Sequence, residues 1–157
     1  MKQTMLALLA VILLGACSGE REYINYRGLS MGMSAKAMAD SLQAQGLALD
    51  TAHSGAASFV LADTLACNFV VTIFQQNDTI TDILEQYSAT YNDSTSQLWQ
   101  TLHDEFEKEY GWPNMPKHGD LHKEAFFENE KGTVILTLLN TYSPTVSVRY
   151  STSTTQD

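Results

Sequence analysis

Basic residues and cysteines are scarce in this 157-residue chain. Nine lysines and arginines stand against 18 aspartates and glutamates, which gives a net charge of −9 at pH 7. Nucleic acid is therefore not expected as a partner, because phosphate recognition requires a basic patch. The two cysteines, Cys17 and Cys67, exclude a disulfide-rich scaffold. The length fits one domain with its own core.

Long apolar runs are also missing. The longest, Met5 to Leu14, has ten residues, whereas a membrane-spanning helix needs ~20. Lys2 precedes this run, and the small residues Gly15 and Ala16 follow it. A positive charge, an apolar run and small residues, in that order, are typical of a secretory signal.

Cys17 directly follows this segment, and Leu14-Gly15-Ala16-Cys17 resembles the lipobox of bacterial lipoproteins. The resemblance implies cleavage before Cys17 and attachment of acyl chains (a diacylglycerol and an N-linked fatty acid such as palmitate) to that residue. Two such signals suffice for stable membrane anchoring. An ordinary signal peptide cleaved elsewhere, or an uncleaved anchor, is the alternative.

Lipidation at Cys17 would determine the charge, the cysteine content, the location and the segments of the chain. Cleavage would remove Lys2 and leave 8 basic and 18 acidic residues, a net charge of −10. Lipidation of Cys17 would leave Cys67 without an intrachain partner. Ser18 replaces the Asp that retains some lipoproteins in the inner membrane, so we expect the cell envelope and its outer membrane. The segments are a signal peptide (1–16), a lipidated Cys with a short tether (17–26), one α+β domain (27–152) and a frayed tail (153–157).

Two helices are predicted from apolar residues at helical spacing. The first covers residues 35–45, with Ser34 as N-cap and Gly46 just past its end. The second runs to Tyr110, and Ser94 with Gln97 three residues later has the spacing of a capping box at its start.

Strands are predicted from alternating apolar residues. Residues 65, 67, 69, 71 and 73 form one apolar face, which predicts a buried and inert Cys67 thiol. Ile80 and Ile83 differ in parity within the next strand, which a β-bulge would explain. The predicted strands are 59–62, 65–74, 79–88, 124–129, 133–140 and 145–151.

The order helix, three strands, helix, three strands predicts the fold class α+β. We expect an antiparallel sheet of about six strands with both helices on one face. The spacing of 65 residues between Gly46 and Gly111 favours a duplicated αβββ unit. An undivided α+β domain with coincidental spacing is the alternative.

The segments Gly28–Ser34 (GLSMGMS) and Glu107–Pro113 (EKEYGWP), the lipobox and the doubled αβββ order support a family resemblance. Together they resemble small envelope lipoproteins with β-lactamase-inhibitor-protein-like or outer-membrane-assembly (SmpA/OmlA-like) domains. The resemblance implies protein–protein binding, and it supplies no catalytic residue.

Candidate chemical groups are few. Asp120 lies between His118 and His122, but Gly119 and Pro116 predict a loop there instead of an aligned metal site. His53 lacks the surroundings of a nucleophile elbow, and His103 borders the apolar side of the second helix. The acidic residues of that helix are interpreted as a solvated face: Asp104, Glu105, Glu107 and Glu109. We therefore expect no catalytic, cofactor-binding or metal-ligating residue.

The sequence thus favours a non-catalytic, membrane-anchored lipoprotein that binds another envelope protein. Phe126 and Phe127 are adjacent in a predicted strand, so one of them should lie on the face of the sheet without helices. That open face is the expected binding surface. A small-ligand or peptide-binding protein is the alternative function, and an enzyme ranks third.

Overall fold

The computed structural model describes residues 22–63 and 68–152. The first half of this part contains the strands β1 (Asn25–Tyr26) and β2 (Leu29–Ser30), the helix α2 (Ala35–Ala44), and the strands β3 (Leu47–Leu49), β4 (Ser58–Asp63), β5 (Phe69–Gln76) and β6 (Thr79–Ser88). The second half contains the helix α3 (Asn92–Tyr110) and the strands β7 (Asn114–His118), β8 (His122–Asn129), β9 (Gly132–Leu139) and β10 (Thr145–Ser151).

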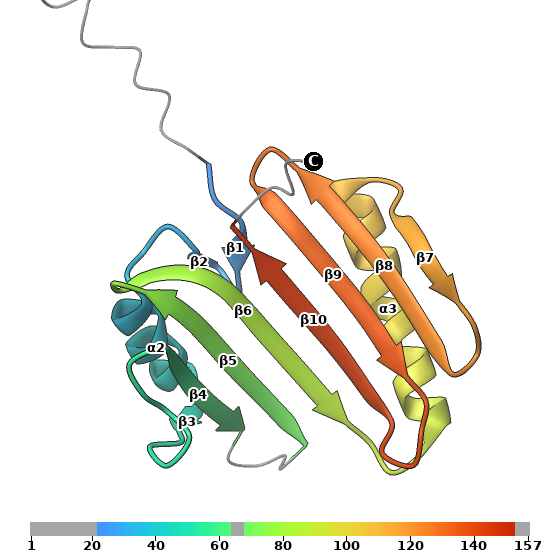
Figure 1. Cartoon of the computed structure of the whole chain (residues 1–157), viewed down its shortest axis with the longest axis horizontal. Helices are drawn as coiled ribbons and strands as arrows, with labels where there is room; N and C mark the ends of the chain where they lie inside the picture. The colour runs from blue at the N-terminus through green and yellow to red at the C-terminus, as the bar shows by residue number, and fades with distance from the viewer. Residues whose placement is uncertain (1–21, 64–67, 153–157) are drawn as a thin grey trace, which may run out of the picture.

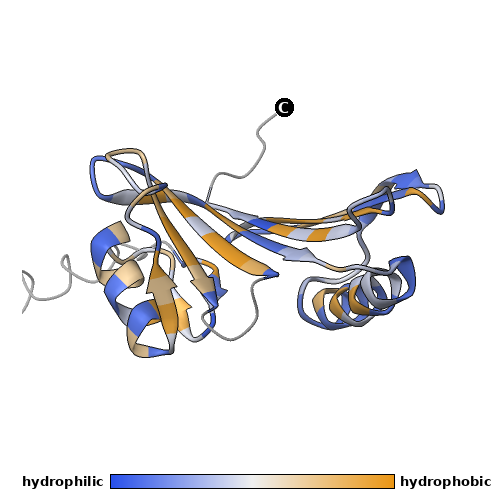
Figure 2. Ribbon diagram, turned by 90° about the horizontal axis from the view of Figure 1, so that it is seen from below, coloured by the Kyte–Doolittle hydropathy of each residue, from blue (hydrophilic) through white to orange (hydrophobic). Residues whose placement is uncertain are grey.

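The described elements form an antiparallel sheet of eight strands in the order β3-β4-β5-β6-β10-β9-β8-β7, plus the small β1-β2 sheet (Figure 1). Both helices lie on the same side of the large sheet (Figure 2). The α+β class and the placement of the helices are therefore as predicted. Each helix is followed by four strands, and the two sets of four meet at β6 and β10.

The predicted count of about six strands is wrong because both edge strands were missed. β3 is three residues long and starts directly after α2, so its first residue, Leu47, is easily taken for the end of the helix turn. β7 contains Pro116, and four of its five residues are exposed, so it carries no alternating signal. Proline and exposed polar residues are common at a sheet edge because they discourage further strand pairing.

The start of α2 agrees with the prediction, whereas the start of α3 does not. Ser34 accepts a hydrogen bond from the Ala37 backbone N–H, and Gly46 adopts φ +106° just past the helix. α3 instead begins at Asn92, with Tyr91 as an N-cap that has no side-chain hydrogen bond. Ser94 therefore lies inside the first turn, and the capping box predicted there is absent.

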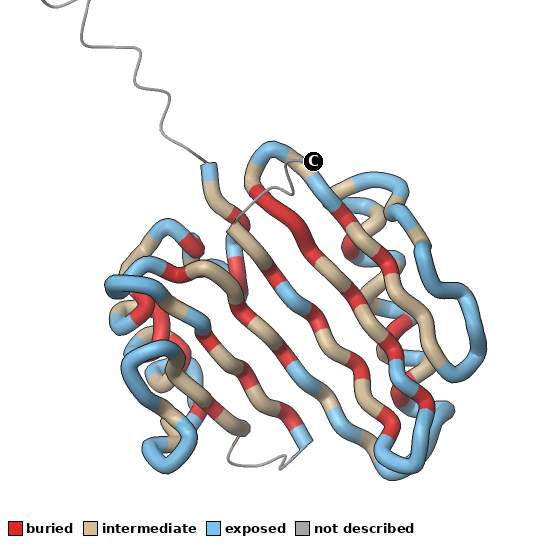
Figure 3. Tube along the Cα trace, in the orientation of Figure 1, coloured by how far each residue is buried: buried red, intermediate tan, exposed pale blue. Residues whose placement is uncertain are grey.

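One face of the sheet builds the core, as the alternation of buried and more accessible residues along the inner strands β5, β6, β10, β9 and β8 indicates (Figure 3). The predicted bulge is confirmed: Gln75 pairs with Ile80 but Phe74 pairs with Asp82, which leaves Thr81 as the extra residue. The bulge returns Ile80 to the same buried face as Ile83. The strand predicted over 65–74 is described only from residue 68, so the environment predicted for Cys67 lies outside the described residues.

The β1-β2 hairpin packs against the middle of the same sheet face. Ile24 and Tyr26 are both at most 1% exposed, so the core takes in residues from the segment predicted as a tether. Arg27 and Gly28 form its two-residue turn with φ of +50° and +79°, the signature of a type I′ turn. The Tyr26 hydroxyl donates to Glu85 Oε1 of β6 at 2.7 Å. The hairpin is thus part of the folded domain.

Candidate functional site

The cysteine that carries the anchoring prediction, Cys17, lies outside the described residues, as does Cys67. No helix within the described ranges has the length and apolar character that a bilayer crossing requires. The lipid-anchoring interpretation therefore stays a prediction.

His118 ends β7, His122 begins β8, and Asp120 lies in the turn between them. Their ligand atoms do not gather into a cluster within the described part of the chain. His118 and Asp120 are exposed, and the Asp120 carbonyl accepts a hydrogen bond from Asn140 Nδ2 at 3.2 Å. Asn140 also contacts the hydroxyls of Thr95 and Ser96. These contacts join the β7–β8 turn and the β9–β10 loop to the first turns of α3.

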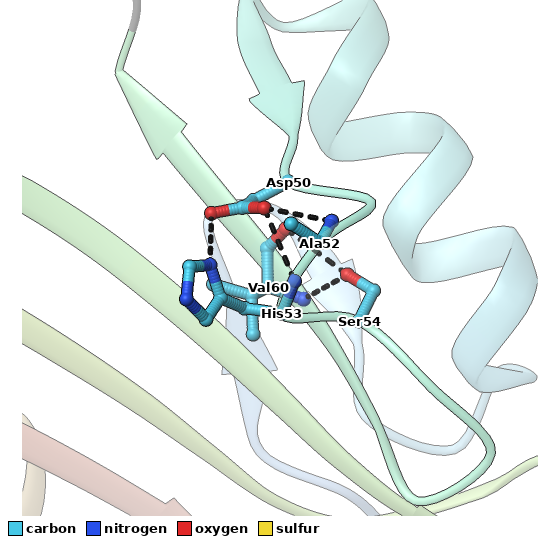
Figure 4. A network of polar contacts seen from close by, with 5 residues as sticks. All are labelled: Asp50, Ala52, His53, Ser54 and Val60. Carbon is cyan, nitrogen blue, oxygen red and sulfur yellow. Dashed lines mark hydrogen bonds and ion pairs between the residues drawn. The ribbon is translucent and has the colours of Figure 1, made fainter.

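His53 lies in the β3–β4 loop, close to an acid and a serine (Figure 4). Its Nδ1 is 2.7 Å from Asp50 Oδ2, which resembles two members of a catalytic triad. The Ser54 hydroxyl, however, accepts from the Val60 N–H at 2.9 Å and donates to the Val60 carbonyl at 3.4 Å. The serine is thus bound to the backbone, and the three residues stabilise the loop.

The acidic residues of α3 are less dispersed than predicted. Asp104 Oδ1 and Glu107 Oε2 lie 3.4 and 3.8 Å from His103 Nδ1. Glu105 and Glu109 are exposed, and Glu109 together with burial raises the pKa of Tyr110 to about 12, with burial the larger cause. Sequence reasoning missed the grouping around His103, although its spacing of four residues from Glu107 was a usable signal.

The open face of the sheet, the face without helices, carries both apolar and polar side chains (Figure 2). The side chain of Phe127 is buried beneath α3, whereas Phe126 points to this open face and is half-buried, as predicted for the pair. Cross-strand pairing places six residues in one line over this face. This open-face row consists of Val60, Thr72, Leu84, Arg149, Ile135 and Phe126.

Arg149 stands at the centre of the open-face row. Its Nε donates to Asp82 Oδ1 at 2.9 Å, and its side chain is 54% exposed. Leu84 and Ile135 are its direct neighbours on β6 and β9. The guanidinium group carries five N–H donors in a planar arrangement that suits carboxylates. The row therefore offers apolar contact on both sides of a positive group.

A shallow hollow of about 660 Å³ adjoins the row over β5, β6 and β10. Phe74, Leu84, Asp82 and Arg149 contribute to its lining, together with glutamines at the β5 end. Phe74 is 36% exposed, a high fraction for a phenylalanine in the middle of a sheet. The hollow can accept an apolar side chain beside a charged pair.

A buried polar network lies on the opposite face of β6. Glu85 is 4% exposed, and it accepts from Tyr26, from Arg27 Nε at 3.1 Å and from the Tyr87 hydroxyl at 3.1 Å. Burial, followed by the nearby Glu85 carboxylate, raises the pKa of Tyr26, Tyr87 and Tyr150 above the usual range. These contacts fix the central strands beneath the open-face row.

The chain was compared with protein-family models, with curated proteins and with solved structures, and none of the three comparisons finds a match.

Proposed function

We propose that this chain is a non-catalytic lipoprotein, anchored to the bacterial envelope through Cys17, that binds another envelope protein with the open face of its sheet. The observation that carries the proposal is the open-face row. In it Leu84, Ile135 and Phe126 remain only half-buried although helices cover the other side. Apolar groups that stay accessible on a surface rimmed by polar residues mark interaction sites in soluble domains.

The size of the open face suits a protein partner. Eight strands spaced at ~4.8 Å span ~34 Å, and an eight-residue strand is ~26 Å long. The resulting footprint of at most ~900 Å² is close to the ~800 Å² that each partner buries in a standard interface. A partner of this kind would present an apolar ridge to Leu84, Ile135 and Phe126 and a carboxylate or carbonyl oxygen to Arg149.

The charge of the domain supports a partner with a basic rim. The chain carries twice as many acidic as basic residues, 18 against 9. Opposite charge around an interface accelerates association and excludes partners with the wrong sign. The same negative charge opposes contact of the domain with anionic lipid head groups, so the membrane contact is assigned to the acyl chains on Cys17.

A photo-reactive amino acid in the full chain, expressed in intact cells, tests the proposal. At Ile135 it should give discrete adducts with one protein, identified by mass spectrometry. At Glu105, on the outward side of α3, it should give none. Adducts of equal yield at both positions, or no protein adduct at Ile135, would contradict binding by the open face. Substitution of Cys17 by Ser should release the protein from the membrane fraction.

A small apolar ligand or a peptide side chain is the second candidate, favoured by the hollow beside Phe74 and Arg149. It predicts that Phe74→Ser abolishes binding while Phe126→Ser, across the sheet, leaves it intact. A protein that covers the whole row would be weakened by both substitutions. Binding of the crosslinked partner to each purified variant separates the two candidates.

A further inference from the structure

A second cluster of polar groups lies on α3, on the other side of the sheet from the open-face row. It consists of His103, Asp104 and Glu107, whose ligand atoms all lie within 4.8 Å of one another. His103 Nδ1 is 3.4 Å from Asp104 Oδ1 and 3.8 Å from Glu107 Oε2. The three groups thus face a common point at the helix surface.

The imidazole of His103 is held in place by aromatic neighbours. Its ring stacks on Trp99 at a centroid distance of 5.0 Å and meets the edge of Phe127 at 5.7 Å. The His103 side chain is only 14% exposed, whereas Asp104 is 53% and Glu107 29% exposed. A side chain that is already held in place loses little conformational freedom when it coordinates a metal ion. The two partly exposed carboxylates keep the site open to solvent.

We propose that His103, Asp104 and Glu107 form a binding site for a divalent transition-metal ion of the zinc class. Zn–N and Zn–O bonds of ~2.0–2.2 Å in a tetrahedron place neighbouring ligand atoms ~3.3–3.5 Å apart. The two distances from Nδ1 are within ~0.5 Å of that spacing, and the carboxylate oxygens of Asp104 and Glu107 lie within 4.8 Å of each other. Rotation of the two partly exposed carboxylates toward each other would complete the ligand set. This site departs from the sequence-based expectation of no metal ligand, and it does not depend on the proposed function.

The ligand types select the class of ion. Imidazole suits zinc and its neighbours in the first transition series, while magnesium and calcium prefer sites made of oxygen alone. Three protein ligands leave the fourth position of a tetrahedral ion open to water or to a donor from another molecule. A second contact supports the geometry, because Gln100 Nε2 donates to Asp104 Oδ1 at 2.8 Å and orients that carboxylate.

Two features set the strength of the site. Lys108 lines the same hollow as Asp104 and Glu107, so its ammonium group opposes a bound cation. Without a metal, the same distances describe polar contacts of His103 with the two carboxylates. A measured affinity for the metal ion distinguishes a metal site from these contacts alone.

Tryptophan fluorescence gives the test, because His103 stacks on Trp99. Trp112→Phe in the full chain removes the other tryptophan, which is 89% exposed. Co²⁺ should then quench Trp99 in a saturable, one-to-one manner, and Zn²⁺ should displace it and restore the emission. Linear quenching without saturation, or no recovery of emission with Zn²⁺, would contradict a metal site and leave only the contacts of His103 with the two carboxylates.

Variants in this background locate the metal. Asp104→Asn and Glu107→Gln, at partly exposed side chains, should each weaken Co²⁺ binding at least ~10-fold, and His103→Gln should abolish it. Lys108→Gln should strengthen it ~2–5-fold by removing the repulsion. His53→Gln is the matched control, because His53 faces one carboxylate only, that of Asp50. Unchanged binding in Glu107→Gln with a folded circular-dichroism spectrum, or loss in His53→Gln, would overturn the assignment.

Discussion

The first half of the domain, from α2 to β6, and the second half, from α3 to β10, share one succession of a helix and four strands. They cover the sheet differently. α2 has 10 residues and packs mainly on β3, β4 and β5, whereas α3 has 19 residues and reaches β8, β9 and the central strand β10. Small side chains, Ala35 and Ala39, line α2, while Trp99 and Phe106 line α3.

The short first helix leaves the central strand β6 without a helical cover, and the β1-β2 hairpin covers it instead. Tyr26 and Arg27 bond to Glu85 there, and the Tyr26 ring meets Tyr150 of β10 at 5.2 Å. The centre of the domain is therefore stabilised partly by polar contacts, whereas its flanks depend on apolar packing.

The largest effect is expected from Phe106→Ala in the second half. The Phe106 ring packs within 5.6 Å of Phe127 and 6.1 Å of Tyr150, measured between centroids. Truncation of a buried aromatic costs ~3–5 kcal/mol out of the ~5–15 kcal/mol of a whole domain. The melting temperature should fall by at least ~6 °C, while Glu105→Ala on the exposed side should leave it within ~2 °C. Equal shifts of the melting temperature in the two variants would contradict the packing of α3 through Phe106.

Leu42→Ala in α2 should have a smaller effect. Leu42 is fully buried, and the loss of its side chain costs ~2–5 kcal/mol. The buried face of its helix includes the small side chains Ala35 and Ala39, whereas Phe106 packs against the aromatic rings of Phe127 and Tyr150. Denaturant unfolding should therefore rank Leu42→Ala below Phe106→Ala, with the exposed Gln45→Ala as control. The reverse order would show that the aliphatic first half carries more of the stability.

Glu85→Gln tests the polar centre between the two halves. The variant keeps the volume but removes the charge that Tyr26 and Arg27 face, so we expect a loss of ~1–3 kcal/mol. In an Arg27→Ala background the same substitution should cost less, because the guanidinium is no longer left unpaired. Glu130→Gln, in an exposed turn, is the control. A cost independent of Arg27 would contradict a shared network.

Alkaline pH should weaken the same centre. Burial, and then the Glu85 carboxylate, raises the pKa of Tyr26 and Tyr150 in the folded state, while an unfolded tyrosine titrates near pH ~10. The unfolded chain then binds fewer protons, so stability present below pH ~10 is lost above it, by ~1.4 kcal/mol per pH unit for each protonated tyrosine. Urea unfolding between pH 8.5 and 11.5 measures this loss. Absorbance at 295 nm that reports ionisation of every tyrosine in the folded protein near pH ~10 would contradict it.

Much of the fold could be predicted because its signals are local. Ser34 and Gly46 indicate where α2 begins and ends, and the alternation in β10 indicates an extended strand. The parity of Ile80 and Ile83 located the bulge. The edge strand β7 could not be predicted, because it contains a proline and four of its five residues are exposed, so it shows no alternation. Glu85 gave no sign of its burial for a different reason, since that burial depends on Tyr26, 59 residues away.

The candidate sites were predictable to different degrees. The sequence placed one of Phe126 and Phe127 on the open face, because alternation determines sides. It did not show that Leu84 stands in one row with Arg149 and Ile135, since that depends on the β6–β10 pairing between the two halves. The grouping of His103 with two acids was visible as spacing, but its fixed ring depends on contact with Phe127 of β8.

The smallest expected effect separates the two helix starts. The Ser34 hydroxyl accepts the Ala37 N–H at 3.2 Å, so Ser34→Ala should cost ~1 kcal/mol. Ser94 lies exposed in the first turn of α3, whose N-cap is Tyr91 without a side-chain bond, so Ser94→Ala should change stability by less than ~0.5 kcal/mol. Asp78 adds two further contacts at the start of α2, to the N–H groups of Ala35 and Lys36, which limits the loss at Ser34. Chemical denaturation of both variants measures the difference. Equal costs would mean that Ser94 caps α3 in solution, as its spacing from Gln97 predicted, and that the two helices start alike.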